Sequence, residues 1–205
     1  MKRMLALLLC LLAICPAHAS GLFDVPALPE GIDLTLGEDH VFLEFDSDPE
    51  YTSISGGMVQ VSFYAYTEDE SALYELYLTF PEDVQPGDVV NPQYAVTAGA
   101  SDCSVALIYS TQEDENYYLA GQLDISPYPE GSDYSIAFAD IASQDGGTRY
   151  AGTLDATLVM LDLSSGLFGQ SLEIVNAPFS FTLPHDPALP RSTVKPTLPP
   201  DMFRV

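Results

Sequence analysis

The feature that most constrains the fold is residues 150–163, which read YAGTLDATLVMLDL. Apolar side chains alternate with threonine and aspartate from Leu154 to Leu158, a period of two that is typical of a β-strand with one face in a core. From Val159 onward apolar residues occupy both parities, which predicts burial on both faces. The stretch is therefore expected to form a long central strand of a β-sheet.

Two more runs, Met58–Tyr66 and residues 72–80, alternate in the same way across a polar connector and predict a hairpin. The register of such a hairpin follows from matching its apolar faces, because a slip of one residue would turn every side chain to the opposite face. The same matching pairs residues 134–142 with the central strand. The expected opposite pairs are Phe63 with Leu76, Val61 with Leu78, Tyr64 with Glu75, Ser62 with Tyr77, Ile136 with Leu154, and Phe138 with Gly152.

About eight strands with short connectors and no convincing helix predict an all-β fold, an antiparallel β-sandwich, with a closed β-barrel as the alternative. Residues 38–183 are expected to form this single domain, after an extended lead-in over residues 20–37. Asn91-Pro92 is expected to break the chain. Residues 171–175 and 179–183 are expected to be separate final strands, with Pro178 marking a bulge or an edge.

The two ends of the chain have compositions unlike the domain. Residues 1–19 combine a basic start, a short apolar run and Ala17-His18-Ala19, which is typical of a cleaved signal peptide and predicts a secreted, extracellular or cell-envelope protein. The apolar run is too short to span a membrane. Residues 184–205 hold six prolines with Arg191, Lys195 and Arg204, and predict a flexible or polyproline tail.

The charge balance excludes some partners. The chain has 30 acidic and 6 basic residues, a net charge of −24, and no lysine or arginine between residues 20 and 148. Nucleic-acid binding is excluded, since it needs cations that face phosphates. Cys103 is the single cysteine after the leader, so no internal disulfide is expected. It is expected to be a buried thiol, and an exposed reactive thiol is the alternative.

No catalytic pattern stands out, so the chain is not expected to be an enzyme. His40 and His185 are the two histidines after the leader, and neither lies beside a serine or cysteine in a nucleophile motif. Most carboxylates, including Glu113–Glu115, fall in predicted turns, where solvated acids make poor proton donors.

A calcium site is the one cofactor that the sequence suggests. Asp46, Asp48 and Glu50 alternate in one loop, as oxygen ligands often do. The pattern departs from an EF-hand, because Tyr51 stands where a glycine is required.

Tyrosine supplies the remaining candidate for binding. The chain has 12 tyrosines and no tryptophan. Tyr64, Tyr66 and Tyr77 are expected to lie together on the outer face of the first hairpin, where tyrosines offer apolar area with a polar tip to a sugar or a protein. The alternative is that they serve only as good strand residues.

These patterns together favour a secreted, acidic, non-catalytic binding or adhesion module with a protein or glycan partner. A calcium-dependent or carbohydrate-binding accessory domain is the first alternative. An extracellular hydrolase that uses two carboxylates is the second.

Overall fold

The computed structural model describes residues 29–37, 39–48, 52–99, 102–121, 129–162 and 167–184. The predicted signal peptide, the tail after Pro184 and Glu50 lie outside these residues. The strands are β1 (Gly31–Leu36), β2 (Asp39–Asp46), β3 (Ser53–Ser55), β4 (Met58–Tyr66), β5 (Ala72–Pro81), β6 (Val89–Val90), β7 (Ser104–Thr111), β8 (Glu115–Gly121), β9 (Asp133–Gln144), β10 (Gly147–Asp162) and β11 (Leu167–Pro184). The helix α2 spans Pro92–Ala98.

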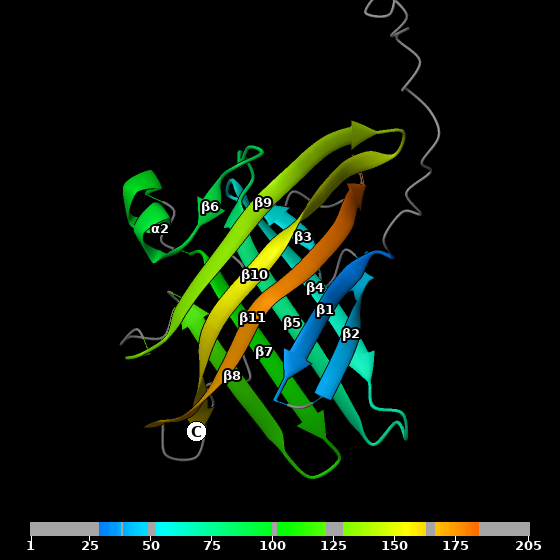
Figure 1. The fold of residues 1–205 in the computed structure, drawn as a ribbon, viewed down its shortest axis with the longest axis vertical. Coiled ribbons are helices and arrows are strands. Elements are labelled where there is room, and N and C mark those ends of the chain that lie inside the picture. Colours follow the sequence, from blue (N-terminus) through cyan, green and yellow to red (C-terminus); the bar gives the residue numbers. More distant parts are fainter. Residues whose placement is uncertain are drawn as a thin grey trace, which may run out of the picture.

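The strands form one antiparallel sheet that closes on itself in a ring. Its order is β1, β2, β4, β5, β7, β8, β10 and β11, and β11 returns to pair with β1. β9 and then β6 extend from β10, and β3 pairs with β4. Figure 1 shows β9, β10 and β11 in a front wall that crosses over β5 and β7 in the wall behind. The predicted all-β antiparallel fold is confirmed.

The strand predicted to be central is β10. It pairs with β11 along its length, with β9 over its first part and with β8 near its end. All six predicted opposite pairs are present in the register. Leu158 and Val159 point to opposite faces of this strand, and both are buried, as is Leu161. The end of β10 is therefore buried on both faces, as its continuous apolar pattern predicts.

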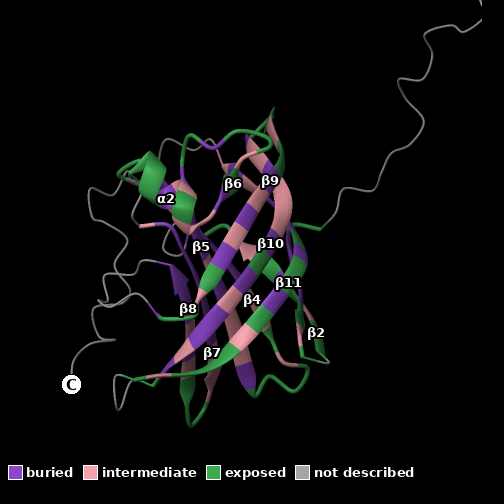
Figure 2. Cartoon of the chain, turned by 60° about the vertical axis from the view of Figure 1, so that its left-hand side comes forward, coloured by how far each residue is buried: buried purple, intermediate pink, exposed green. Residues whose placement is uncertain are grey.

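Aromatic rings from both walls fill the space inside the ring. The centroid of Phe80 on β5 lies 4.9 Å from that of Phe138 on β9 and 6.3 Å from that of Phe181 on β11. Phe63 on β4 lies 5.8 Å from Phe181. Alternate residues along β9, β10 and β11 are buried and more exposed, as the bands of colour in Figure 2 show. The described interior of the closed sheet is therefore a packed core.

Two elements differ from the expectations for the first half of the chain. The lead-in expected over residues 20–37 contains β1, whose Ile32 and Leu34 are fully buried on alternate positions. Asn91-Pro92 begins α2 and does not simply break the chain. The Asn91 side chain accepts a hydrogen bond from the Tyr94 backbone N–H at 2.8 Å, and proline suits a first helical turn, where its missing N–H costs nothing.

The two strands expected at the C-terminal end of the domain are one strand, β11. The break falls at a bulge near Asn176, two residues before Pro178. Asn176 adopts a φ of 49°, and its N–H donates to the Asp155 carboxylate at 2.8 Å, so the bulge is satisfied from the neighbouring strand. Among the described residues no helix is long and apolar enough to cross a membrane.

Candidate functional site

The best candidate site is the outer face of β4, β5, β7 and β8. Cross-strand register places one row of side chains in the order Glu44, Tyr64, Glu75, Ile108 and Tyr117. Because Phe63, Leu76 and Leu107 point into the core, the residues next to them in sequence must point outward. We call this surface the tyrosine–carboxylate face; its members are Glu44, Tyr64, Tyr66, Glu75, Tyr77, Glu115 and Tyr117.

The three tyrosines predicted from the sequence all belong to this face, but in two different settings. The rings of Tyr64 and Tyr66 meet edge to face, with centroids 6.4 Å apart and an interplanar angle of 80°. Tyr66 is 61% exposed, and Tyr64 is half-buried. Tyr77 is also half-buried and packs against a separate apolar cluster. Tyr66 and Tyr64 thus present the accessible aromatic area, and Tyr77 lies at the edge of an apolar floor.

The apolar floor is a second cluster outside the main core. It consists of Ala106, Ile108, Tyr117, Leu119 and Leu161, with Tyr77 and Phe168 against its edge. Simple alternation of apolar and polar residues does not reveal this cluster. Its signal is the run over residues 105–109, in which apolar residues occupy both parities and so require burial on both sides of β7.

Two glutamates stand at the edge of this floor, each held by a tyrosine. The Tyr77 hydroxyl donates to the Glu75 Oε1 at 3.1 Å, and the Tyr117 hydroxyl donates to the Glu115 carboxylate. Burial raises the pKa of Glu75, with further contributions from the negative charges of Glu115 and Asp46, while the bond from Tyr77 opposes the shift. Burial and the bond to Glu115 raise the pKa of Tyr117.

Glu115 was expected to be a solvated turn carboxylate, and the structure corrects that expectation in part. It is exposed, but it opens β8 and accepts the Tyr117 hydroxyl. Its position beside the floor follows from the β7–β8 register, in which Ser110 lies opposite Glu115 and Ile108 opposite Tyr117.

The titration of Glu75 gives a test of this arrangement. We expect its carboxyl to titrate above the ordinary glutamate value, and Tyr77→Phe to raise that pKa further by removing a donor to the charged form. A raised pKa means that the folded state holds the proton more tightly than the unfolded state. Glu75 therefore contributes stability below the ordinary value of 4.5, and this contribution is lost as the pH rises through the raised pKa.

Side-chain carbon NMR against pH measures the shift directly. Urea denaturation of Glu75→Gln gives the matching stability test, since glutamine resembles the protonated acid. The gain in stability of this variant over the wild type should be largest at neutral pH and disappear below pH 4.5. A Glu75 pKa that falls in Tyr77→Phe contradicts the geometry.

A surface cleft of about 700 Å³ adjoins the floor. The β7–β8 turn forms one side and the end of β10 forms the other, and Leu161 belongs to both the floor and the cleft. Its lining includes four carboxylates: Glu113, Asp114, Glu115 and Asp162. In the described residues no three histidine, cysteine or acidic side chains are grouped closely enough to hold a metal ion.

Hydrogen bonds join the described residues on either side of the loop proposed for calcium. The Asp46 carboxylate accepts the Asp48 backbone N–H at 2.9 Å, and the Thr52 hydroxyl donates to the Asp46 carbonyl at 2.6 Å. Because Glu50 lies outside the described residues, the three suggested ligands are not seen together. Calcium binding at Asp46, Asp48 and Glu50 stays a prediction.

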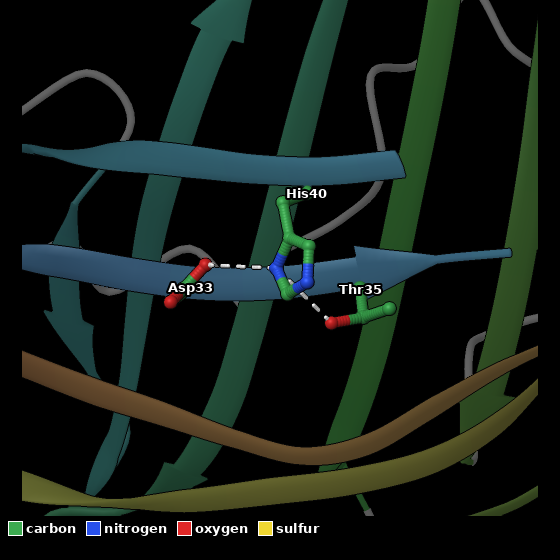
Figure 3. Close-up of polar contacts among 3 residues, drawn as sticks. All are labelled: Asp33, Thr35 and His40. Atoms are coloured by element: carbon green, nitrogen blue, oxygen red, sulfur yellow. Dashed lines mark hydrogen bonds and ion pairs between the residues drawn. The ribbon is translucent and has the colours of Figure 1, made fainter. Parts of the chain in front are cut away.

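His40 lies on β2, opposite Thr35 of β1, on the exposed outer side of this hairpin. Its Nδ1 is 3.4 Å from the Thr35 hydroxyl oxygen and 4.0 Å from the Asp33 carboxylate, as Figure 3 shows. Both neighbours approach the same ring nitrogen, whereas a catalytic triad needs the acid on one nitrogen and the nucleophile on the other. His185 lies outside the described residues.

Cys103 is fully buried, as the sequence predicts. Burial raises the pKa of its thiol to about 12, so it is neutral at physiological pH and shielded from reagents.

Comparison of the chain with family models, curated proteins and solved structures finds no match. The function must therefore be argued from the geometry and charge of the tyrosine–carboxylate face.

Proposed function

We propose that this protein is a secreted, non-catalytic binding or adhesion module that captures a basic protein partner on the tyrosine–carboxylate face. The observation that carries the proposal is the combination of accessible tyrosine rings and carboxylates on one face of the sheet, backed by a buried apolar cluster. Tyrosine is enriched at interfaces because it offers large contact area at a low entropic cost. The negative charge of the carboxylates favours a partner with positive charge.

The charge distribution supports a cationic partner over a neutral glycan. Arg149 is the one lysine or arginine in the described part of the chain, and it pairs with Asp140 at 3.7 Å on β9 and β10. No described cation therefore neutralises Glu44, Glu75 or Glu115. A partner that brings lysine or arginine beside apolar groups meets both the carboxylates and the accessible rings of Tyr64 and Tyr66, and the long-range field of an acidic body speeds its approach.

The secreted part of the proposal is supported by the predicted signal peptide over residues 1–19 and by the strong excess of acidic residues. A stable scaffold outside the cell is consistent with the closed sheet, in which the walls are joined by backbone hydrogen bonds on every side.

An array of basic, neutral and acidic peptides together with neutral oligosaccharides tests the proposal on the purified protein. We expect basic peptides that contain apolar residues to bind, and to be released as ionic strength rises. Tyr66→Ala should weaken this binding about tenfold, the scale at which an interface side chain contributes more than most of its neighbours. Val175→Ala is the matched control, because Val175 is similarly exposed, at 67%, but lies on β11.

Two outcomes of the same experiment contradict the proposal. Binding of neutral oligosaccharides alone would favour the carbohydrate-binding alternative. Hydrolysis of an oligosaccharide, abolished by Glu75→Gln, would favour the carboxylate hydrolase, for which the raised pKa of Glu75 near the charge of Glu115 is the supporting observation.

A further inference from the structure

The residues that follow Pro184 hold most of the basic residues of the chain outside the leader. Outside the leader, the chain has four lysine and arginine residues, and three of them are Arg191, Lys195 and Arg204. The fourth, Arg149, is paired on the sheet. The positive charge available to the acidic face within this chain is therefore concentrated in the tail.

The tail also has a regular proline pattern. It contains Pro187-Ala188-Leu189-Pro190-Arg191 and Lys195-Pro196-Thr197-Leu198-Pro199. Each is a P-x-x-P repeat with one cation directly beside it. Such repeats favour the polyproline II conformation, and protein surfaces that recognise it use aromatic side chains for the proline ridges. Carboxylates beside those aromatics then pair with the flanking cation.

The tyrosine–carboxylate face presents both groups on its accessible side. Tyr66 is 61% exposed and stands edge-on to Tyr64, which gives two ring surfaces at an angle. Glu44 lies opposite Tyr64 in the register and is exposed. A proline ridge seated against the two rings places its flanking cation next to this carboxylate.

We propose that the proline-rich tail docks through its P-x-x-P repeats on the tyrosine–carboxylate face of its own chain and competes there with the external partner. The competition rests on the proposed function; the docking itself does not. The tail is thus a built-in competitor that lowers the apparent affinity of the face until a stronger basic partner displaces it.

The length of the tail allows docking within one chain. The 21 residues that follow Pro184 reach about 65 Å in a polyproline conformation. This is comparable to the full length of β11, whose 18 residues span about 60 Å. A short tether gives an effective concentration in the millimolar range, so a contact of modest intrinsic affinity still occupies the face most of the time.

A synthetic peptide of residues 185–205 is the probe, titrated against two forms of the full chain. One is the wild type, and the other carries Arg191→Gln, Lys195→Gln and Arg204→Gln together, so that its own tail no longer competes. We expect the peptide to bind the neutralised form about tenfold more tightly than the wild type. Tyr66→Ala in the neutralised background should abolish this binding, and Val175→Ala should leave it unchanged.

Two further arms make the result decisive. A peptide with all its prolines replaced by alanine keeps the three cations; equal binding of this peptide would overturn docking by the repeats and leave simple charge attraction. Amide NMR spectra of wild type and neutralised form should differ at Tyr66 and Glu75 in low salt and agree in high salt. Identical spectra in low salt overturn the inference, as does a difference that depends on protein concentration, which would mean docking between copies.

The two proposals fail in distinguishable ways. If the tail peptide binds but no external basic peptide does, the docking stands and the proposed function fails. If external peptides bind the wild type and the neutralised form equally, the proposed function stands and the competition by the tail fails.

Discussion

Phe181→Ala is expected to lower the free energy of unfolding by about 3–5 kcal/mol, the range for removing a buried aromatic ring from a core. Phe181 is fully buried. Its ring centroid lies 5.2 Å from Tyr150, 5.3 Å from Phe45 and 5.8 Å from Phe63. These rings belong to β10, β2 and β4, so the substitution removes packing contacts in both walls of the sheet.

Urea denaturation followed by circular dichroism measures this loss, provided that the slope of the unfolding transition is the same for variant and wild type. Val175→Ala on the same strand is the control, since Val175 is largely exposed and its truncation should change stability by no more than about 0.5 kcal/mol. A loss below about 1 kcal/mol in Phe181→Ala would show that the rings do not form one packed core.

Local pairing could be predicted because two rules act on neighbouring segments. The period of two identifies which side chains share a face, and a hairpin permits one register that keeps the apolar faces together. Phe63 therefore had to meet Leu76, and Ile136 had to meet Leu154. Exposing one such pair would cost several kcal/mol, which is comparable to the whole stability of a domain.

Closure of the sheet could be predicted only as an alternative to the sandwich, because it depends on pairing between distant segments. β1 meets β11 through Ile32 and Phe179, and β10 meets β8 through Leu161 and Tyr117. Every strand presents similar apolar faces and the same backbone hydrogen-bonding groups, so the sequence pattern does not reveal which distant edges pair. The sheet order follows from the packing of the whole core.

The candidate site was predicted in part for the same reason. Tyr64, Tyr66 and Tyr77 lie on one local hairpin, whose faces the alternation determines. Glu115 and Tyr117 reach the same surface only through the pairing of β5 with β7 and of β7 with β8. The raised pKa of Glu75 is likewise a property of that assembled surface, since it depends on burial and on Glu115 and Asp46.

Gly152→Ala is expected to destabilise the fold by about 3 kcal/mol, at the upper end of the cost of overpacking a core. Gly152 lies on β10 opposite Phe138 of β9 and Phe179 of β11, and the rings of these two residues meet edge to face at 5.8 Å. A Cβ at this position would lie 1.9 Å from the Ala137 carbonyl oxygen and 2.8 Å from the Phe179 ring.

The obstacle at Gly152 is backbone, so it has little freedom to move. A bulge between Ala151 and Gly152 brings β9 unusually close, and displacing the Ala137 carbonyl would break the ladder of β9 and β10. In a chain of this size a loss of 3 kcal/mol should lower the melting temperature by roughly 6–12 °C. Thermal unfolding followed by circular dichroism measures the change.

Gly169→Ala is the matched control for this prediction, because it adds the same methyl group to the partner strand β11. The Cβ there would lie 3.1 Å from the Met160 Cε, the far end of a flexible side chain that is able to turn aside. We expect its stability to stay within about 1 kcal/mol of the wild type. Equal melting temperatures for the two glycine variants would contradict the close approach of β9 to β10 at Gly152. They would also contradict the packing of Phe138 and Phe179 over this position.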